Sequence, residues 1–163
     1  MEHGTPNSLN RLAVRATTHC LTGCAIGEVL GLVIGTALGL ATLATLAIAI
    51  GLAFFFGYAL TMRPLIGSGM AFAEATKLAL AADTLSITVM EITDNAILLV
   101  IPGAMDAGLA DLLFWGSLAV ALGIAWVVAF PANRWLIARG RGHAVVHGAH
   151  DEDHDPASGG DLR

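Results

Sequence analysis

The chain of 163 residues carries 8 Lys and Arg against 13 Asp and Glu, a formal net charge of −5. Hydrophobic residues make up 56% of it and charged residues 13%, with a mean hydropathy of +0.74, which excludes an ordinary soluble globular domain. Basic residues are too few for a nucleic-acid interface, so we expect no nucleic-acid partner. The expected surroundings are a lipid bilayer.

Four apolar segments have about the 20 residues that a helix needs to cross roughly 30 Å of hydrocarbon. We therefore predict an all-α membrane protein with four transmembrane helices at about 16–38, 42–62, 78–101 and 112–133. The uncharged run 29–60 is too long for one crossing and should turn back near Gly39, since glycine tolerates a tight turn. Pro131 should bend or end the fourth helix.

All Lys and Arg residues fall on one side of these spans, before the first, between the second and third, and after the fourth. The positive-inside rule then predicts that both termini are cytoplasmic. We expect residues 1–141 to form a four-helix transmembrane domain with a short N-terminal arm. Residues 142–163 should form a flexible His- and Asp-rich cytoplasmic tail, because their composition cannot build a core.

The first span carries ionisable side chains on one face. Cys20, Cys24 and Glu28 are four residues apart and fall within an arc of about 80°, whereas His19 lies about 100° from Cys20. Small residues recur on the same face, namely Gly23, Gly27, Gly31 and Gly35. This spacing lets helices approach closely, so we predict that the glycines pack against protein, within the chain or in an oligomer.

The third span has a matching polar stripe. Asp83, Met90 and Asp94 fall within about 40° of one another, and Glu91 and Asn95 flank them. These side chains should face the protein interior, since ionisable residues in a membrane avoid lipid.

Spans 1 and 3 run in the same direction if both termini are cytoplasmic, so depths along them can be compared. The helical rise places Glu28 about 18 Å and Glu91 about 20 Å from the cytoplasmic end. Cys20 and Asp83 each come within about 8 Å of that end. The two polar faces should therefore meet.

Carboxylates at this depth have no Lys or Arg beside them, so each must be protonated, solvated or neutralised by a cation. Thiols and a thioether beside carboxylates suit a thiophilic metal, with Cu(I) or Zn(II) ahead of Mg(II). The candidate metal ligands are Cys20, Cys24, Glu28, Glu91, Asp94, His19, Asp83 and Met90.

The leading hypothesis is a membrane protein that binds or transports a thiophilic metal ion between helices 1 and 3. Cys20, Cys24 and His19 would form a cytoplasmic-side site, and Glu28 with its acidic partners a midplane site. Packing alone also explains a membrane cysteine, and Met90 by itself is more typical of packing. No catalytic residue is assigned, because the sequence has no phosphate loop or serine-nucleophile motif.

Two other functions remain open. Cys20 and Cys24 have Cα atoms about 6 Å apart in a helix, within the disulfide range, as in a thiol oxidoreductase coupled to quinone. Helical rotamers point both sulfurs the same way, however, which favours chelation. The third alternative is a non-catalytic accessory or structural subunit whose polar residues bind a partner's helix.

The acidic tail contains histidines amid carboxylates, a composition that collects Zn(II), Ni(II) or Cu(II) in some proteins. Its histidines are His143, His147, His150 and His154. A solvated tail without a metal site is the favoured interpretation.

The stretches THCLTGCAIGEVLG (18–31), MEITDNAILLVIPGAMDAGLADLLFWGSL (90–118) and FPANRWLIARGRGHAVVH (130–147) resemble an uncharacterised bacterial family of small four-span membrane proteins, catalogued as a domain of unknown function. The resemblance covers roughly residues 12–147 and implies a multi-pass protein of the bacterial cytoplasmic (inner) membrane. It implies no activity. We expect a homo-oligomer or a complex with a partner membrane protein, since one four-helix chain offers little room for a pathway.

Overall fold

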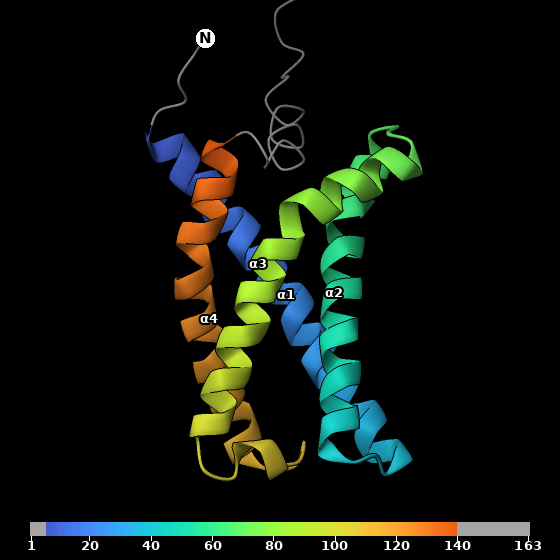
Figure 1. Ribbon diagram of the computed structural model, residues 1–163, viewed down its shortest axis with the longest axis vertical. Coiled ribbons are helices and arrows are strands. Elements are labelled where there is room, and N and C mark those ends of the chain that lie inside the picture. The colour runs from blue at the N-terminus through green and yellow to red at the C-terminus, as the bar shows by residue number, and fades with distance from the viewer. Residues whose placement is uncertain (1–5, 140–163) are drawn as a thin grey trace, which may run out of the picture.

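The computed structural model describes residues 6–139 and contains four long helices with one short 3-10 helix in this range. They are α1 (Pro6–Leu38), α2 (Thr42–Gly67), α3 (Phe72–Val100), η1 (Ala104–Asp106) and α4 (Leu112–Ala138). Successive helices run in opposite directions and lie side by side (Figure 1). The all-α prediction is therefore confirmed.

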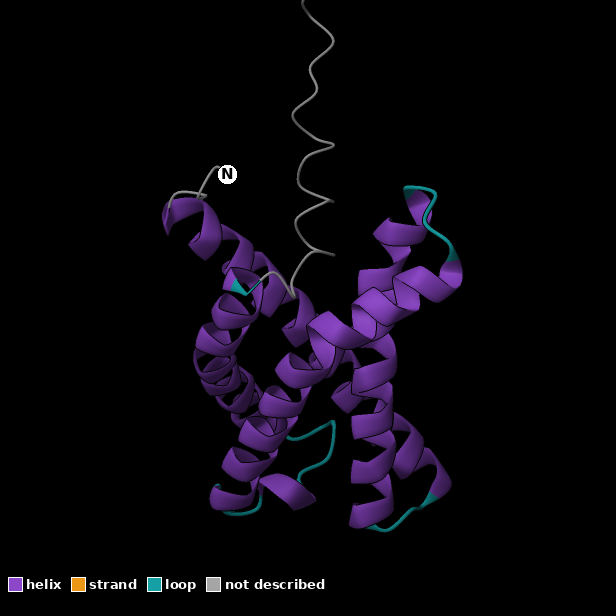
Figure 2. Cartoon of the chain, turned by 45° about the horizontal axis from the view of Figure 1, so that its top comes forward, coloured by secondary structure: helices purple, strands orange, loops and turns teal. Residues whose placement is uncertain are grey.

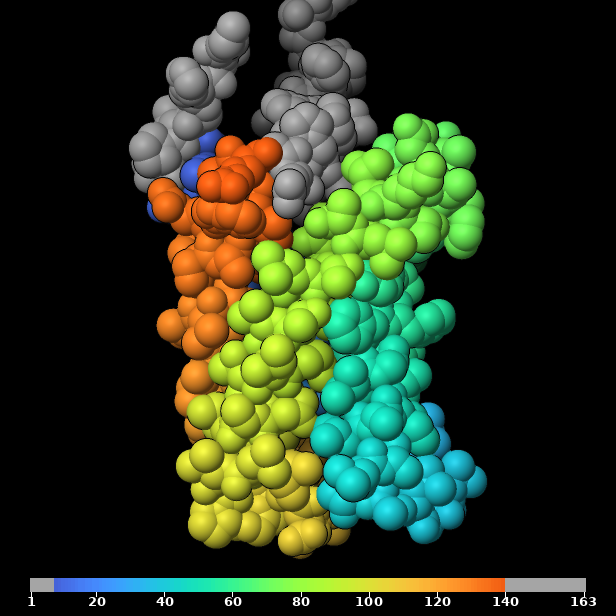
Figure 3. All heavy atoms as spheres, viewed as in Figure 1, coloured from blue at the N-terminus to red at the C-terminus, as the bar shows by residue number. Residues whose placement is uncertain are grey.

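The helix α1 is the centre of the bundle. It contacts α2, α3 and α4, whereas α2 and α4 lie on opposite sides of it. In the space-filling view the other three helices hide most of α1 (Figure 3). The buried polar side chains of α1, among them Thr17, Cys20 and Cys24, lie between helices.

Three of the described helices are long and apolar enough to cross a membrane: α1 from Ser8, α2 and α4. The helix α3 does not meet the same composition test, because it carries Asp83, Glu91 and Asp94 in addition to Glu74 and Lys77. These helices have the length and composition of a membrane protein with several spans.

Some helix ends differ from the predicted spans. The helix α1 begins at Pro6, well before residue 16, and α4 continues through Pro131 to Ala138. The expectation that Pro131 ends the fourth helix is wrong. A proline removes one backbone hydrogen bond, and neighbouring helices keep a membrane helix continuous around such a position.

The turn between α1 and α2 follows the prediction at Gly39, whose φ of 63° lies in the left-handed region that glycine adopts freely. The backbone N–H of Leu40 donates to the carbonyl of Gly35 at 2.9 Å. Helix ends commonly close in this way, with a glycine just after the last turn.

The glycine face of α1 packs directly on α2. A Cβ placed on Gly23 would lie 2.7 Å from the Cα of Gly57, and one on Gly31 would lie 2.5 Å from the Cα of Ala49. At Gly27 it would collide with Ala53. The glycines thus bring two helices of one chain together, and their face is not free to join a second copy.

Near the termini, polar side chains connect α1 to α4. The Nδ2 of Asn133 donates to the Oγ1 of Thr17 at 2.8 Å, and both side chains are buried. The Nε of Arg134 donates to the Oδ1 of Asn10 at 2.7 Å on the surface. These bonds hold α4 against the first half of α1.

The helix α3 changes direction along its length. Its first part leans over α2 and its second part lies beside α4 (Figures 1 and 2). Hydroxyls along this helix donate to the carbonyl four residues earlier, an interaction that bends helices, at Thr76, Thr84, Thr88 and Thr93. The bend lets the acidic part of α3 approach α1.

Candidate cation site

Three carboxylates from two helices meet in the interior of the bundle. Glu28 of α1 and Glu91 and Asp94 of α3 each place one oxygen within 4.8 Å of the other two. Glu91 is 5% exposed and Asp94 is fully buried. The Glu28 side chain is half-buried as a whole, but both of its carboxylate oxygens are buried. We call these residues the acid triad.

The sequence places these carboxylates through simple helix geometry. Glu91 and Asp94 are three residues apart, so they share a face of α3. Glu28 lies beyond Cys24 on the face of α1 that turns toward α3, while the neighbouring glycines contact α2. Both helices run in the same direction from the end of the bundle that holds the N-terminus. Side chains at similar depths therefore meet.

None of the six carboxylate oxygens of the acid triad has a hydrogen-bond partner among the described residues. An ionised carboxylate buried without a partner costs several kcal/mol. Lys and Arg lie only near the helix ends, outside the apolar middle of the spans. The triad must therefore hold protons or a cation.

A second buried polar cluster lies closer to the termini. The Sγ of Cys20 lies 3.8 Å from the Oδ1 of Asp83, in a sulfur-to-carboxylate hydrogen bond. Ser86 lies beside the Cys20 thiol. Among the described residues, the other oxygen of Asp83 and the hydroxyl of Ser86 are buried without a geometric hydrogen-bond partner. We call Cys20, Asp83 and Ser86 the inner polar cluster. Sequence reasoning missed Ser86, although it lies on the stripe formed by Asp83, Met90 and Asp94.

The remaining candidate ligands have other surroundings. Cys24 and Met90 are fully buried in an apolar cluster with Ile87. His19 is half-buried, and its Nε2 is buried with no hydrogen-bond partner within the part of the chain that the structure describes. Within the described residues, only the acid triad brings three His, Cys, Asp or Glu ligand atoms within 4.8 Å of one another. Both cysteines are free thiols.

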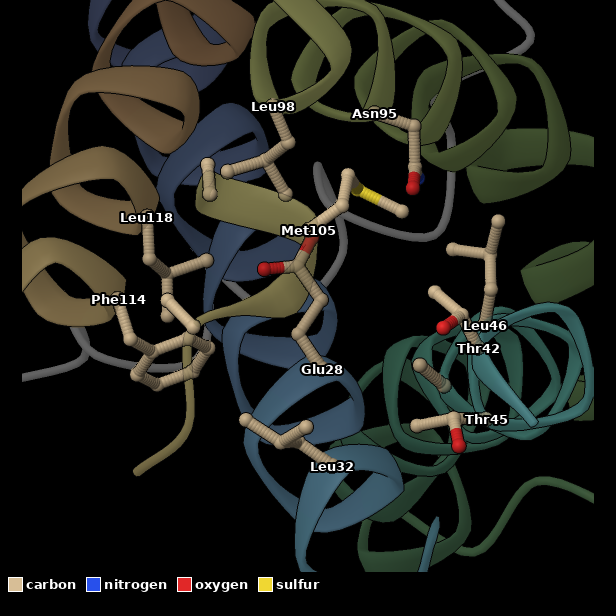
Figure 4. Close-up of a pocket in the computed structure, with 13 residues that line it drawn as sticks. Glu28, Leu32, Thr42, Thr45, Leu46, Asn95, Leu98, Met105, Phe114 and Leu118 are labelled. Carbon is tan, nitrogen blue, oxygen red and sulfur yellow. The ribbon is translucent and has the colours of Figure 1, made fainter. Parts of the chain in front are cut away.

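A partly open pocket of about 90 Å³ adjoins the acid triad, with Glu28 and Asn95 in its wall (Figure 4). The Nδ2 of Asn95 donates to the backbone carbonyl of Glu91 at 2.8 Å. The pocket thus meets the triad at Glu28 and has room for several water molecules.

A family model described as a domain of unknown function, DUF4396, matches residues 10–142. The chain belongs to this family. The resemblance to an uncharacterised family is thereby confirmed, and the DUF4396 match includes the acid triad and the inner polar cluster. Comparisons with curated proteins and with solved structures found no match. The histidines of the predicted tail and the expected flexibility of 142–163 lie outside the described residues.

Proposed function

We propose that this protein binds a divalent metal ion within the membrane at the acid triad and exchanges it across the bilayer. The observation that carries the proposal is the meeting of three buried carboxylates whose oxygens have no protein partner among the described residues. A cation supplies the missing interaction for all three at once.

Charge balance supports a divalent ion. Three ionised carboxylates carry three negative charges, so a divalent cation together with one retained proton makes the site neutral. Of the two metals favoured by the sequence, Zn(II) fits this donor set better, because it accepts carboxylate oxygens, whereas Cu(I) selects sulfur. Neither thiol is one of these three ligands, although Cys24 lies beside Glu91.

The proposal includes α3 as the fourth transmembrane helix. At 29 residues it measures about 44 Å, which is longer than the hydrocarbon core. Its acidic side chains are buried, whereas Ile92 and Leu99 on its outer side are 66% and 71% exposed. The basic residues on one side of four spans support an orientation with both termini in the cytoplasm of a bacterial inner-membrane protein.

The inner polar cluster is suited to a second metal-binding step, which lies nearer the cytoplasm than the acid triad. Cys20 and Asp83 form a buried pair of sulfur and oxygen donors, and the unpartnered hydroxyl of Ser86 lies in the same cluster. Thiols exchange metal with a soft donor more readily than carboxylates do. We propose that metal leaving or reaching the triad on the cytoplasmic side passes this cluster, with Cys24 and His19 beside it.

The alternatives have less support. A thiol oxidoreductase needs a cysteine that a partner reaches, but Cys20 and Cys24 are 1% and 0% exposed. An accessory subunit would direct its polar side chains toward a partner's helix, but the triad faces the interior of its own bundle. We retain oligomer formation as part of the proposal, through a surface other than the glycine face.

Zn(II) binding to the purified protein in detergent tests this function, with bound radioactive zinc measured at equilibrium. The parent should bind zinc, and Asp94→Asn should lose most of it because a charged donor is removed from a buried site. Glu74→Gln is the matched control, since Glu74 is an exposed acid on the same helix. A parent that binds neither Zn(II) nor Mn(II) contradicts the proposal.

A further inference from the structure

The pocket beside the acid triad lies at the end of the bundle opposite the N-terminus. Its wall includes Thr42 and Thr45 at the start of α2 and Met105 in the loop between α3 and α4. Both of these segments lie at the far end of the bundle from the N-terminus (Figure 1). With both termini cytoplasmic, this end is the non-cytoplasmic one.

Glu28 is the residue that the pocket and the acid triad share. Its carboxylate points into the pocket beneath Met105 (Figure 4), and one of its oxygens is also within 4.8 Å of the other triad ligands. Glu91 and Asp94 are not among the lining residues. An ion in the pocket would therefore meet Glu28 before the rest of the triad.

Asn95 is arranged to supply a neutral oxygen on the same path. Its Nδ2 is occupied by the backbone carbonyl of Glu91, at 2.8 Å. Its side-chain oxygen points into the pocket (Figure 4). An amide oxygen assists a partly dehydrated cation without adding charge.

On the side of the triad away from the pocket, packed side chains leave no open path for an ion. Cys24, Ile87 and Met90 form an apolar cluster in which each side chain is fully buried. A hydrated ion has no room there unless the helices move, because membrane-protein interiors of this kind are close-packed.

We propose that this pocket is the port through which a hydrated divalent cation enters and leaves the acid triad from the non-cytoplasmic side, with the Asn95 oxygen as its first protein ligand. The inference rests on the proposed function. It adds the route of the ion, the side of the membrane from which the ion enters, and the first protein ligand that the ion meets. The pocket has room for several water molecules, so the ion could keep part of its hydration shell until it reaches Glu28.

Cysteine labelling of the pocket wall tests the port. Met105→Cys and Leu46→Cys place a thiol in the wall from two different segments, and Ala110→Cys and Ala47→Cys are exposed controls beside them. Each purified variant is treated with a bulky, charged maleimide. Two quantities are then measured, the zinc bound at equilibrium and the rate at which bound radioactive zinc exchanges with unlabelled zinc.

Labelling at either pocket position should slow zinc exchange by about tenfold or more, corresponding to a barrier raised by about 1.4 kcal/mol. Labelled controls should exchange zinc like the parent. If both pocket variants bind zinc and exchange it at the control rate after labelling, the port is overturned while the triad function stands. If the unlabelled parent binds no zinc, the proposed function itself fails.

Asn95→Leu tests the ligand, because it keeps the approximate size of the side chain and removes the oxygen. We expect zinc affinity to fall about tenfold, by the usual relation of about 1.4 kcal/mol per factor of ten. Thr93→Val is the matched control, since its hydroxyl donates to its own helix at Val89 rather than to the pocket. Unchanged affinity in Asn95→Leu contradicts the role of this oxygen.

Discussion

Glu28 on α1 and Asp94 on α3 bring carboxylate oxygens within 4.8 Å of each other, although the residues are far apart in the sequence. Neither carboxylate has a hydrogen-bond partner among residues 6–139. Two like-charged groups at this separation in an apolar interior repel each other unless a proton or a cation lies between them. The bundle therefore brings together carboxylates whose close approach is stable only when a proton or a cation is bound between them.

The acid triad should behave as a unit. We expect Glu28→Gln and Glu91→Gln each to abolish zinc binding, and the double variant to be no worse than either single one, because residues acting on one ion are strongly non-additive. Zinc titration of the four proteins in detergent measures this. Full zinc binding by both single variants would mean that the carboxylates are protonated packing residues.

Zinc binding should release protons and weaken as the pH falls. A carboxyl group must lose its proton before it ligates a metal, so protons compete with zinc for the triad. Titration of the parent in two buffers of different protonation enthalpy gives the number of protons released, which we expect to be about two per ion. Zinc affinity that does not change with pH would exclude a site built from these carboxyl groups.

The contact between α1 and α2 should tolerate no added side chain at its closest point. Gly27→Ala should lower the free energy of unfolding by about 1–3 kcal/mol, the usual cost of overpacking, because the new Cβ collides with Ala53. Gly51→Ala is the control, since a Cβ there meets nothing within 4 Å. Thermal unfolding in detergent compares the two, and equal midpoints would contradict the packing role of Gly27.

Reporter fusions test the orientation on which the port depends. Fusions at either terminus or within 63–77 should report cytoplasm, and those at 39–41 or 102–111 should report the opposite side, because Lys and Arg concentrate on the cytoplasmic face. Termini on opposite sides would show that an odd number of helices cross, as expected if α3 does not, whereas two non-cytoplasmic termini would mean an inverted bundle. In the first case the pocket would not open to the non-cytoplasmic side as proposed, and in the second it would face the cytoplasm.

The thiols should remain reduced and protected. We expect Cys20 and Cys24 to react slowly with alkylating reagents in the folded protein, equally with and without a reductant, because both are buried free thiols. Added Zn(II) should slow alkylation of Cys20 further if the inner polar cluster takes part in exchange. A disulfide that cycles in cells would favour the oxidoreductase instead.

Much of the site could be predicted from single helices. A rotation of about 100° per residue puts Glu91 and Asp94 on one face, and the helical rise gives Glu28 and Glu91 nearly equal depths. The apolar length of the segments and the turn at Gly39 likewise follow from local chemistry. These properties depend on one helix at a time, so the sequence by itself determined them.

The tertiary structure decided which faces meet. The sequence showed a glycine face but could not choose between a helix of the same chain and a second copy, because small residues at this spacing let either helix approach closely. Packing on Gly57 and Ala53 settles that choice, and the resulting rotation of α1 directs Glu28 toward α3. The same rotation places Cys20 beside Asp83 and Cys24 beside Glu91. Which thiol lies beside which carboxylate is a property of four packed helices, since it depends on distances between side chains that no single helix contains.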